Sequence, residues 1–219
     1  MTVFVVSAPS GTGKTTLNRR LLKDCPELEM SVSHTTRAPR SGEVDGVHYH
    51  FLKPESFREL VRQNAFIEWA EVHGNLYGTS LSELKRIENA GKHPLLEIDI
   101  QGWHTAKSLL PQALSIFILP PSLRSLWERL EKRGSDRLET RWIRLQNAYE
   151  EIQKAHEYDV LIINNELEPA YNKLKSVILT GDRDEVGRRA GLLLCEKLNE
   201  EFKNAEWIRE LKEKLGERP

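Results

Sequence analysis

A glycine-rich segment near the N-terminus, residues 7–16 (SAPSGTGKTT), carries side chains that can bind phosphate. Phosphate-binding loops place a glycine, four residues and then Gly-Lys-Ser/Thr. Gly13, Lys14 and Thr15 supply the end of this pattern, but Ala8 stands where the first glycine is expected. Lys14 can bring a positive charge to the β- and γ-phosphates of a nucleotide, and the Thr15 hydroxyl can bind Mg²⁺. An ordinary glycine turn is the alternative.

The segments on either side of this loop favour a phosphate site. Residues 2–6 (TVFVV) have the character of a short buried strand, and residues 15–25 (TTLNRRLLKDC) repeat leucine at helical spacing. Ala8 tolerates its place, because Pro9 biases it towards extended geometry, which alanine adopts without strain. A strand, a loop and a helix let loop N–H groups and the positive end of the helix dipole converge on an anion.

A second group of basic and hydroxyl residues follows in residues 31–51 (SVSHTTRAPRSGEVDGVHYHF). Arg37 and Arg40 lie three residues apart, and Tyr49 comes later in the segment. Guanidinium groups match phosphate oxygens, and a tyrosine hydroxyl adds one donor. The segment therefore indicates a second phosphorylated substrate, with two exposed loop arginines as the alternative.

Glu68 is an acidic residue within an apolar run in residues 66–80 (FIEWAEVHGNLYGTS). A buried carboxylate needs a partner. It can accept hydrogen bonds from N1–H and from the exocyclic amine of guanine, whereas adenine has no donor at N1. Taken alone, Glu68 would be better explained as a surface residue on a strand edge.

Composition excludes several classes of protein. Lys and Arg number 32 and Asp and Glu number 33 among 219 residues, so we expect no bulk-charge binding of nucleic acid. No apolar run reaches the roughly 18 residues of a membrane helix. Cys25 and Cys195 lack metal-ligand spacing, so we expect two reduced thiols and a cytoplasmic protein.

Strand-like segments alternate with helical patterns, which predicts an α/β fold with a central parallel sheet flanked by helices. The strand-like segments are residues 2–6, 94–99 (PLLEID), 114–119 (LSIFIL) and 159–164 (DVLIIN). We expect four regions: a core of residues 1–33, 81–125 and 159–180; an inserted subdomain of residues 34–80; a lid with its flanking helices, residues 126–158; and a C-terminal helical extension, residues 181–219.

These segments together resemble guanylate kinases, P-loop kinases that phosphorylate GMP with ATP. The resemblance covers about residues 3–178 and implies a P-loop kinase fold with a GMP-binding subdomain and a lid. Members of this family often carry alanine at the place of Ala8, which implies a working loop. The matching segments, in the order of the family, are SAPSGTGKTTL, SVSHTTRAPRSGEVDGVHYHF, FIEWAEVHGNLYGTS, LLEIDIQG, ERLEKRG and NNELEPAY.

The resemblance also implies the residues that bind GMP. Asp99, at the end of the predicted strand 94–99, matches an acidic group near Mg²⁺ that acts through water, and Glu97 on the same strand face can support it. The positions that match GMP-binding residues are Ser33, Glu68 and Thr79 for guanine, Arg37, Arg40, Tyr49 and Tyr77 for the phosphate, and Glu97 and Asp99 beside the metal.

The ATP site is implied in the same way, with Mg²⁺ as cofactor. Lys14, Arg133 and Arg144 match catalytic cations, the two arginines closing with the lid. The positions that match ATP-binding residues are Ala8, Pro9, Ser10, Gly11, Thr12, Gly13, Lys14, Thr15, Thr16, Arg129 and, beside the adenine, Asn164.

Two regions depart from the family pattern. In the lid, Arg137 and Arg141 are extra cations, which we expect to pair with Asp136 and Glu139 or to face solvent, and Trp142 is unexpected. In the extension, apolar residues at helical spacing favour an amphipathic helix packed on the core over a partner-binding surface. They are Leu194, Leu198, Trp207, Ile208, Leu211 and Leu215.

Two other functions remain open from the sequence. One is a phosphopeptide-binding module of the guanylate-kinase-like kind found in membrane scaffold proteins, but those domains lack the intact lysine that Lys14 provides. The other is a P-loop kinase with a different acceptor, against which Glu68, Ser33 and Thr79 argue. The expected partners are GMP or dGMP and ATP, and the chain is expected to be a monomer or a homodimer.

Overall fold

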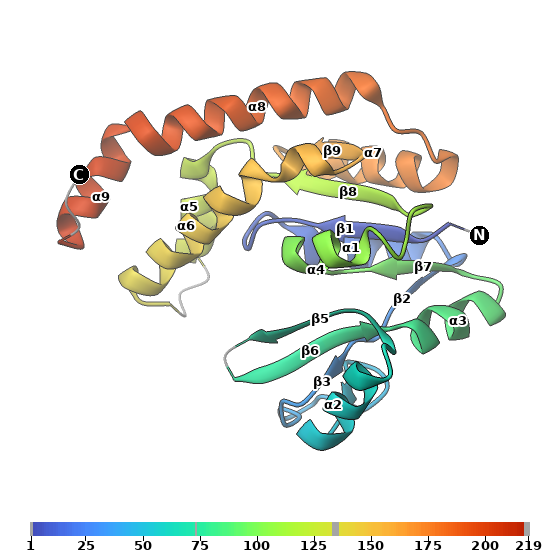
Figure 1. The fold of residues 1–219 in the computed structure, drawn as a ribbon. Helices are drawn as coiled ribbons and strands as arrows, with labels where there is room; N and C mark the ends of the chain where they lie inside the picture. Colours follow the sequence, from blue (N-terminus) through green and yellow to red (C-terminus); the bar gives the residue numbers. More distant parts are fainter. Residues whose placement is uncertain (1, 73, 133–135, 217–219) are drawn as a thin grey trace. The chain divides into compact units, whose positions relative to one another are not determined.

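The computed structural model describes residues 2–72, 74–132 and 136–216 (Figure 1). The chain forms two compact units. The first holds Met1–Val5 and Leu22–Leu114, and the second holds Val6–Leu21 and Ser115–Pro219.

Parallel strands form the core of the first unit. The strand β7 (His93–Leu96) pairs in parallel with β2 (Leu28–Met30) and with β1 (Phe4–Ser7), placing Leu95 opposite both Met30 and Phe4. The side chains of Phe4, Leu95 and Leu96 are buried. Two helices complete this layer, α3 (Leu81–Asn89), which contacts β7, and α4 (Ile100–Ala106).

The first unit also contains a small mixed sheet. Its strands lie in the order β4-β3-β6-β5, and β5 and β6 form a long antiparallel hairpin. The helix α2 packs on it through Phe57, whose ring stacks 4.4 Å from that of Phe66. The bounds are β3 (His34–Thr35), β4 (His50–Phe51), α2 (Pro54–Arg62), β5 (Phe66–Val72) and β6 (Asn75–Ser80).

The second unit is built on another parallel pair. The strands β8 and β9 run side by side, with Ile116 opposite Val160 and Leu119 opposite Ile163. Together with the parallel pairs of the first unit, the flanking helices confirm the predicted α/β fold. The bounds are α1 (Lys14–Asp24), β8 (Leu114–Leu119), α5 (Leu123–Lys132), α6 (Leu138–Gln153), η1 (Ala155–Glu157), β9 (Val160–Ile163) and α7 (Leu167–Thr180).

Two further helices, α8 (Glu185–Asn204) and α9 (Glu206–Lys214), form the extension. Figure 1 shows α8 as the long helix beside β9. The approach is close at Gly191, where a Cβ atom would lie 2.5 Å from Cβ of Leu161. Leu198, Ile208 and Leu211 are buried. The expectation that the extension packs on the core is therefore confirmed.

Two sequence expectations about the chain as a whole can be compared with the structure. Cys25 and Cys195 are not joined in a disulfide, in agreement with the prediction of two thiols. None of the helices in residues 2–72, 74–132 and 136–216 is both long and apolar enough to cross a membrane.

Candidate functional site

A cavity of about 220 Å³ in the first unit brings together most of the residues predicted to bind GMP. Its lining combines hydroxyl, carboxyl and apolar groups from the mixed sheet and from the segment after β7. The lining residues are Ser33, Tyr49, Glu68, Ala70, Val72, Tyr77, Gly78, Glu97, Ile98 and Asp99.

Glu68 is the buried carboxylate of this cavity. It lies on β5 with 8% of its surface exposed, directly opposite Thr79 on β6. The Thr79 hydroxyl donates a hydrogen bond of 2.6 Å to Glu68 Oε1. On the other side is the backbone of Gly102 in α4, where a Cβ atom would lie 3.0 Å from Glu68 Oε2. The carboxylate is thus held between a hydrogen-bond donor and a residue that must be small.

Burial raises the pKa of Glu68 above its ordinary value. The hydrogen bond from Thr79 opposes this shift, and the nearby charge of Asp99 adds to it. A buried carboxylate with this environment can accept hydrogen bonds strongly from a ligand that carries two adjacent donors.

The position of Asp99 corrects the strand prediction. The strand β7 ends at Leu96, so Glu97 and Asp99 do not share a strand face. Asp99 is instead the N-cap of α4, and its Oδ1 accepts a hydrogen bond of 2.7 Å from Gly102 N. A short polar side chain at this position satisfies a free N–H of the first helical turn, which explains why α4 begins at Ile100. Both acidic residues still line the cavity.

Arg37 and Arg40 do not line this cavity. The Arg37 guanidinium donates to both oxygens of Glu43, at 2.8 and 3.0 Å, and lies 5.5 Å from the centre of the Tyr49 ring. The Arg40 side chain is exposed, while its backbone N–H donates to Glu43 at 2.7 Å. These bonds from Arg37 and Arg40 lower the pKa of Glu43 to about 2.

Sequence reasoning did not identify Glu43. Its spacing, three residues after Arg40 and six after Arg37, is the signal that could have indicated a carboxylate closing the arginine loop.

A second cavity, of about 350 Å³, lies over the predicted phosphate loop in the second unit. Gly11 and Gly13 have φ of +93° and +100°, values that favour glycine, whereas Ala8 is not among the residues with positive φ. The helix α1 begins at Lys14 directly after the loop, so its N-terminus belongs to the cavity. The lining residues are Ala8, Pro9, Ser10, Gly11, Gly13, Lys14, Thr15, Thr16 and Glu151.

Arg129 and Asn164, both predicted to bind ATP, contact the loop backbone. Asn164 Nδ2 donates to the Thr12 carbonyl at 2.7 Å, and Arg129 Nη1 donates to the same oxygen at 3.2 Å. Arg129 Nη2 also donates to the carbonyl of Asn164 at 3.0 Å. A Cβ atom on Gly13 would lie 2.7 Å from Asn164 Nδ2, so a glycine is needed here for space as well as for φ.

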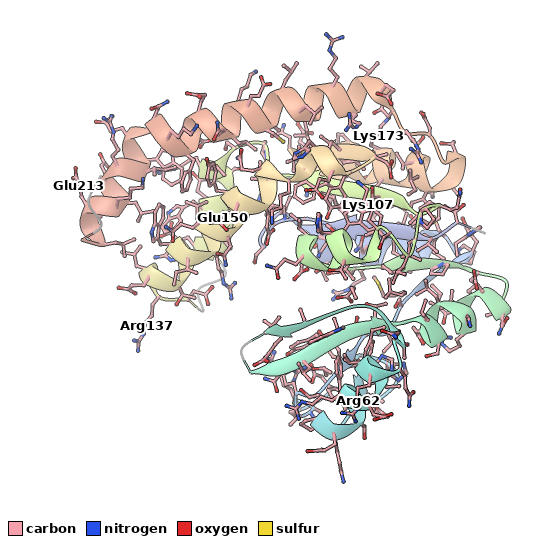
Figure 2. All side chains as sticks on the ribbon, in the orientation of Figure 1. Arg62, Lys107, Arg137, Glu150, Lys173 and Glu213 are labelled. Atoms are coloured by element: carbon pink, nitrogen blue, oxygen red, sulfur yellow. The ribbon has the colours of Figure 1, made fainter. Side chains whose placement is uncertain are left out.

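Glu151 is a further residue that sequence reasoning missed. It lies on α6 and lines the phosphate-loop cavity. Glu150 precedes it and is exposed (Figure 2). Two adjacent glutamates on a polar helix give no sequence signal to tell the one that lines a cavity from the one that faces solvent.

Within the predicted lid, the structure describes Arg137, Arg141 and Arg144. Arg133 lies outside the described residues. Arg144 Nη1 is 3.2 Å from Asp136 Oδ2. Arg137 is exposed and points away from α6, as expected for a solvent-facing residue (Figure 2).

The expectation for Arg141 is wrong. Its Nη1 donates to Glu131 at 2.6 Å, and its guanidinium lies 5.1 Å from the centre of the Trp127 ring. Its side chain is only 16% exposed, because it packs between α5 and α6 instead of pairing along its own helix. Trp142, unexpected from the family pattern, is buried and stacks on Phe202 of the extension.

Comparison with known proteins identifies the family of this chain. A family model described as guanylate kinase matches residues 1–180. A guanylate kinase of Shewanella denitrificans is 48% identical over 179 residues, covering 81% of this chain and 86% of the relative. One of Pseudomonas fluorescens is 46% identical over 199 residues, covering 90% and 97%.

A solved structure is similar as well. The crystal structure of guanylate kinase from Anaplasma phagocytophilum matches with a TM-score of 0.64 and 32% identity, over 85% of this chain and 88% of that one. The resemblance inferred from the sequence is thereby confirmed. Since the family model spans most of the chain and the relatives match over nearly their full length, the chain belongs to the guanylate kinase family.

Proposed function

We propose that this protein transfers the γ-phosphoryl group of ATP to GMP or dGMP, giving ADP and GDP or dGDP. The observation that carries the proposal is the buried Glu68 carboxylate, fixed by Thr79 in a cavity. Membership of the guanylate kinase family supports it. The reaction would serve purine nucleotide metabolism and GMP recycling in the cytoplasm.

Glu68 is suited to reading guanine. When ionised, it accepts hydrogen bonds from N1–H and from the exocyclic amine, two donors that adenine does not present side by side. Thr79 occupies one lone pair of Oε1 and fixes the plane of the carboxylate. Ser33, at the same cavity, adds a hydroxyl that can bond the base.

The GMP phosphate would be bound by Arg37, Arg40, Tyr49 and Tyr77. Tyr49 and Tyr77 line the cavity, with ring centres 6.0 Å apart. Arg37 Nη2 donates to both oxygens of Glu43, which fixes the guanidinium beside Tyr49, so that little side-chain entropy would be lost when it binds a phosphate.

ATP would be bound by the phosphate loop, with Lys14 beside the β- and γ-phosphates. Mg²⁺ takes oxygen ligands and usually keeps several waters and substrate phosphates, so the hydroxyl of Thr15 in the loop cavity fits it, with Asp99 acting through water. When bound, Mg²⁺ would neutralise phosphate charge.

Phosphoryl transfer needs alignment and charge stabilisation more than covalent chemistry from the protein. The acceptor phosphate of GMP is already ionised, so no general base is needed. Negative charge spreads over three oxygens of the transferred group, and Lys14 together with Arg133 and Arg144 would stabilise it. Exclusion of water keeps the γ-phosphoryl group from hydrolysis.

The test is a coupled assay of ADP formation with GMP, dGMP, AMP, UMP and dTMP as acceptors. We expect turnover with GMP and dGMP and little with the others. Turnover with a pyrimidine or with AMP would show that Glu68 does not read guanine. Absence of turnover with every acceptor, in a protein that binds GMP, would favour a binding module over an enzyme.

A further inference from the structure

The extension caps a helix that supports the phosphate loop. Glu201, near the end of α8, accepts hydrogen bonds from the first two backbone N–H groups of α5, those of Leu123 and Arg124, both at 2.9 Å. These N–H groups have no partner within a helix, and a carboxylate at a helix N-terminus is also favoured by the helix dipole. Glu201 lies beyond residue 180, where the match to the family model ends.

The helix α5 lies directly against the phosphate loop. A Cβ atom on Gly11 would lie 3.0 Å from Leu126 Cδ1 and 3.2 Å from Leu130 Cδ2, so both leucines pack on the glycine backbone. Arg129, which directly precedes Leu130 and lies one turn after Leu126, donates to the carbonyl of Thr12. A shift of α5 along its axis would therefore move the packing surface and the hydrogen bond that fix Gly11 and Thr12.

Aromatic contacts hold the extension in the position from which Glu201 reaches α5. Phe202, the next residue, stacks on Tyr149 of α6 at 3.9 Å with an interplanar angle of 9°. Trp207 of α9 lies 6.4 Å from Trp127 of α5, and the Arg124 guanidinium lies 5.4 Å from the Trp207 ring centre. Glu201 therefore lies on a segment fixed to both α5 and α6.

We propose that Glu201 is a positioning residue for the ATP site: it fixes the N-terminus of α5, and α5 in turn holds Gly11 and Thr12 in their phosphate-binding conformation. The proposal rests on the proposed function in assuming that this loop binds ATP. It gives the extension a role in nucleotide affinity in addition to its part in the core.

The test compares three variants of the full chain. Glu201→Gln keeps one acceptor oxygen and Glu201→Ala keeps none. Glu200→Gln is the matched control, because Glu200 lies on the same turn and its carboxylate accepts from Asn204 of the same helix. Each protein is titrated with a fluorescent ATP analogue in the presence of Mg²⁺ and, separately, with GMP by calorimetry. Thermal unfolding is recorded for all.

We expect the Kd for the ATP analogue to rise in the order unaltered protein, Glu201→Gln, Glu201→Ala, by about two- to thirtyfold for alanine, the range that corresponds to loss of a helix cap. The Kd for GMP should change less than twofold, and Glu200→Gln should match the unaltered protein. Hydrogen exchange of the amides in residues 10–16 should become faster in Glu201→Ala without nucleotide.

Other outcomes would overturn the proposal. A lower Tm with unchanged ATP-analogue affinity in Glu201→Gln and Glu201→Ala would make the contact purely structural. Equal losses of ATP-analogue and GMP affinity would indicate general destabilisation. Because binding is measured without turnover, an unaltered protein that binds the ATP analogue but does not phosphorylate GMP would refute the proposed function while leaving this test intact.

Discussion

The hydroxyl of Thr79 donates a 2.6 Å hydrogen bond to the carboxylate of Glu68, and both residues are buried on adjacent strands. Hydrogen bonds to ionised groups are shorter and stronger than neutral ones. The pair therefore fixes the direction of the carboxylate before any ligand binds, which lowers the entropy lost on binding.

Replacing Thr79 with valine, which has the same shape but no donor, should weaken GMP binding. The lost hydrogen bond to a charged group is worth about 1.5–3 kcal/mol, which corresponds to at least a roughly tenfold rise in the Kd for GMP if it is felt fully in the complex. Thr79→Ser keeps the hydroxyl and should bind nearly normally. Calorimetry with GMP measures both, and equal affinities for the two variants would contradict the assigned role.

Glu68→Gln should reduce selectivity for GMP much more than ATP binding. An amide has one acceptor atom, so one guanine donor loses its partner, and kcat/KM for GMP should fall tenfold or more. Glu71→Gln, on the exposed part of the same strand, is the matched control. If Glu68→Gln lost affinity for ATP and kept its affinity for GMP, the assignment of Glu68 to the GMP site would be wrong.

GMP binding should also weaken as pH falls through the raised pKa of Glu68. Burial favours the protonated carboxyl, and guanine needs the ionised form, so protonation competes with binding. Because the pKa of Glu68 is higher in the folded than in the unfolded state, its protonation stabilises the fold at low pH, and this contribution to stability is lost as pH rises through the raised pKa. Calorimetry with GMP is done between about pH 5 and pH 7 on the unaltered protein and on Glu68→Gln. Comparing the two proteins separates this effect from titration of the GMP phosphate, which occurs at about pH 6 in both. The Glu68→Gln protein should lack the additional pH dependence.

Lys14→Ala should abolish most turnover and leave the fold intact. Lys14 is the first residue of α1 and lines the loop cavity, where its charge can meet the β- and γ-phosphates. Lys23→Ala, at an exposed position of the same helix, serves as the control. Unchanged turnover in a Lys14→Ala protein with normal Tm would remove the loop from the mechanism.

In the lid, Arg133→Ala and Arg144→Ala should lower kcat far more than they raise the KM for GMP. An arginine that meets the phosphates on closure stabilises the transition state more than the ground state. Steady-state kinetics of the two single variants checks this.

Arg141→Ala and Arg137→Ala should have milder effects on kcat. Arg141 packs on Trp127, so its removal should lower Tm while kcat stays close to normal. Arg137 is exposed, and its removal should change neither. If Arg141→Ala lowered kcat strongly and Arg144→Ala lowered it little, the catalytic role would belong to Arg141 and not to Arg144.

Stability should fall in mild acid because of His34. Burial, followed by the nearby His50, lowers the pKa of His34 to about 4. An unfolded histidine titrates near 6.5, so the folded state binds fewer protons and stability is lost as pH falls from about 6.5 to about 4. Urea unfolding at several pH values should show a smaller loss in His34→Gln. His156→Gln, at an exposed site, should keep the full loss.

The sequence was informative where residue type and spacing decide structure. The loop glycines take positive φ as expected, and Ser33, Tyr49, Glu68 and Tyr77 meet at one cavity. Strand β7 was predicted too long. Apolar residues recur at Leu95, Leu96 and Ile98, but the strand ends at Leu96, and Asp99 caps α4 instead of continuing the strand.

The partners of charged side chains were harder to predict. Glu139 is close to Arg141 in sequence and lies on the same helix, yet Arg141 pairs with Glu131 because α5 and α6 pack together. Glu201 looks like one more acid on a solvated helix face, and its role depends on where α8 ends in space. Tertiary packing determines which charged side chains pair, and the local periodicity of the sequence does not reveal that packing.

The packing of the extension has a spectroscopic consequence. Of the five tryptophans, Trp127, Trp142 and Trp207 lie in the second unit at contacts between the extension, α5 and α6. Trp69 and Trp103 lie in the first unit, one 48% exposed and the other 2%. Intrinsic fluorescence therefore reports strongly on the docking of α8 and α9. Detachment of these helices should be visible as a red shift in emission without any attached dye.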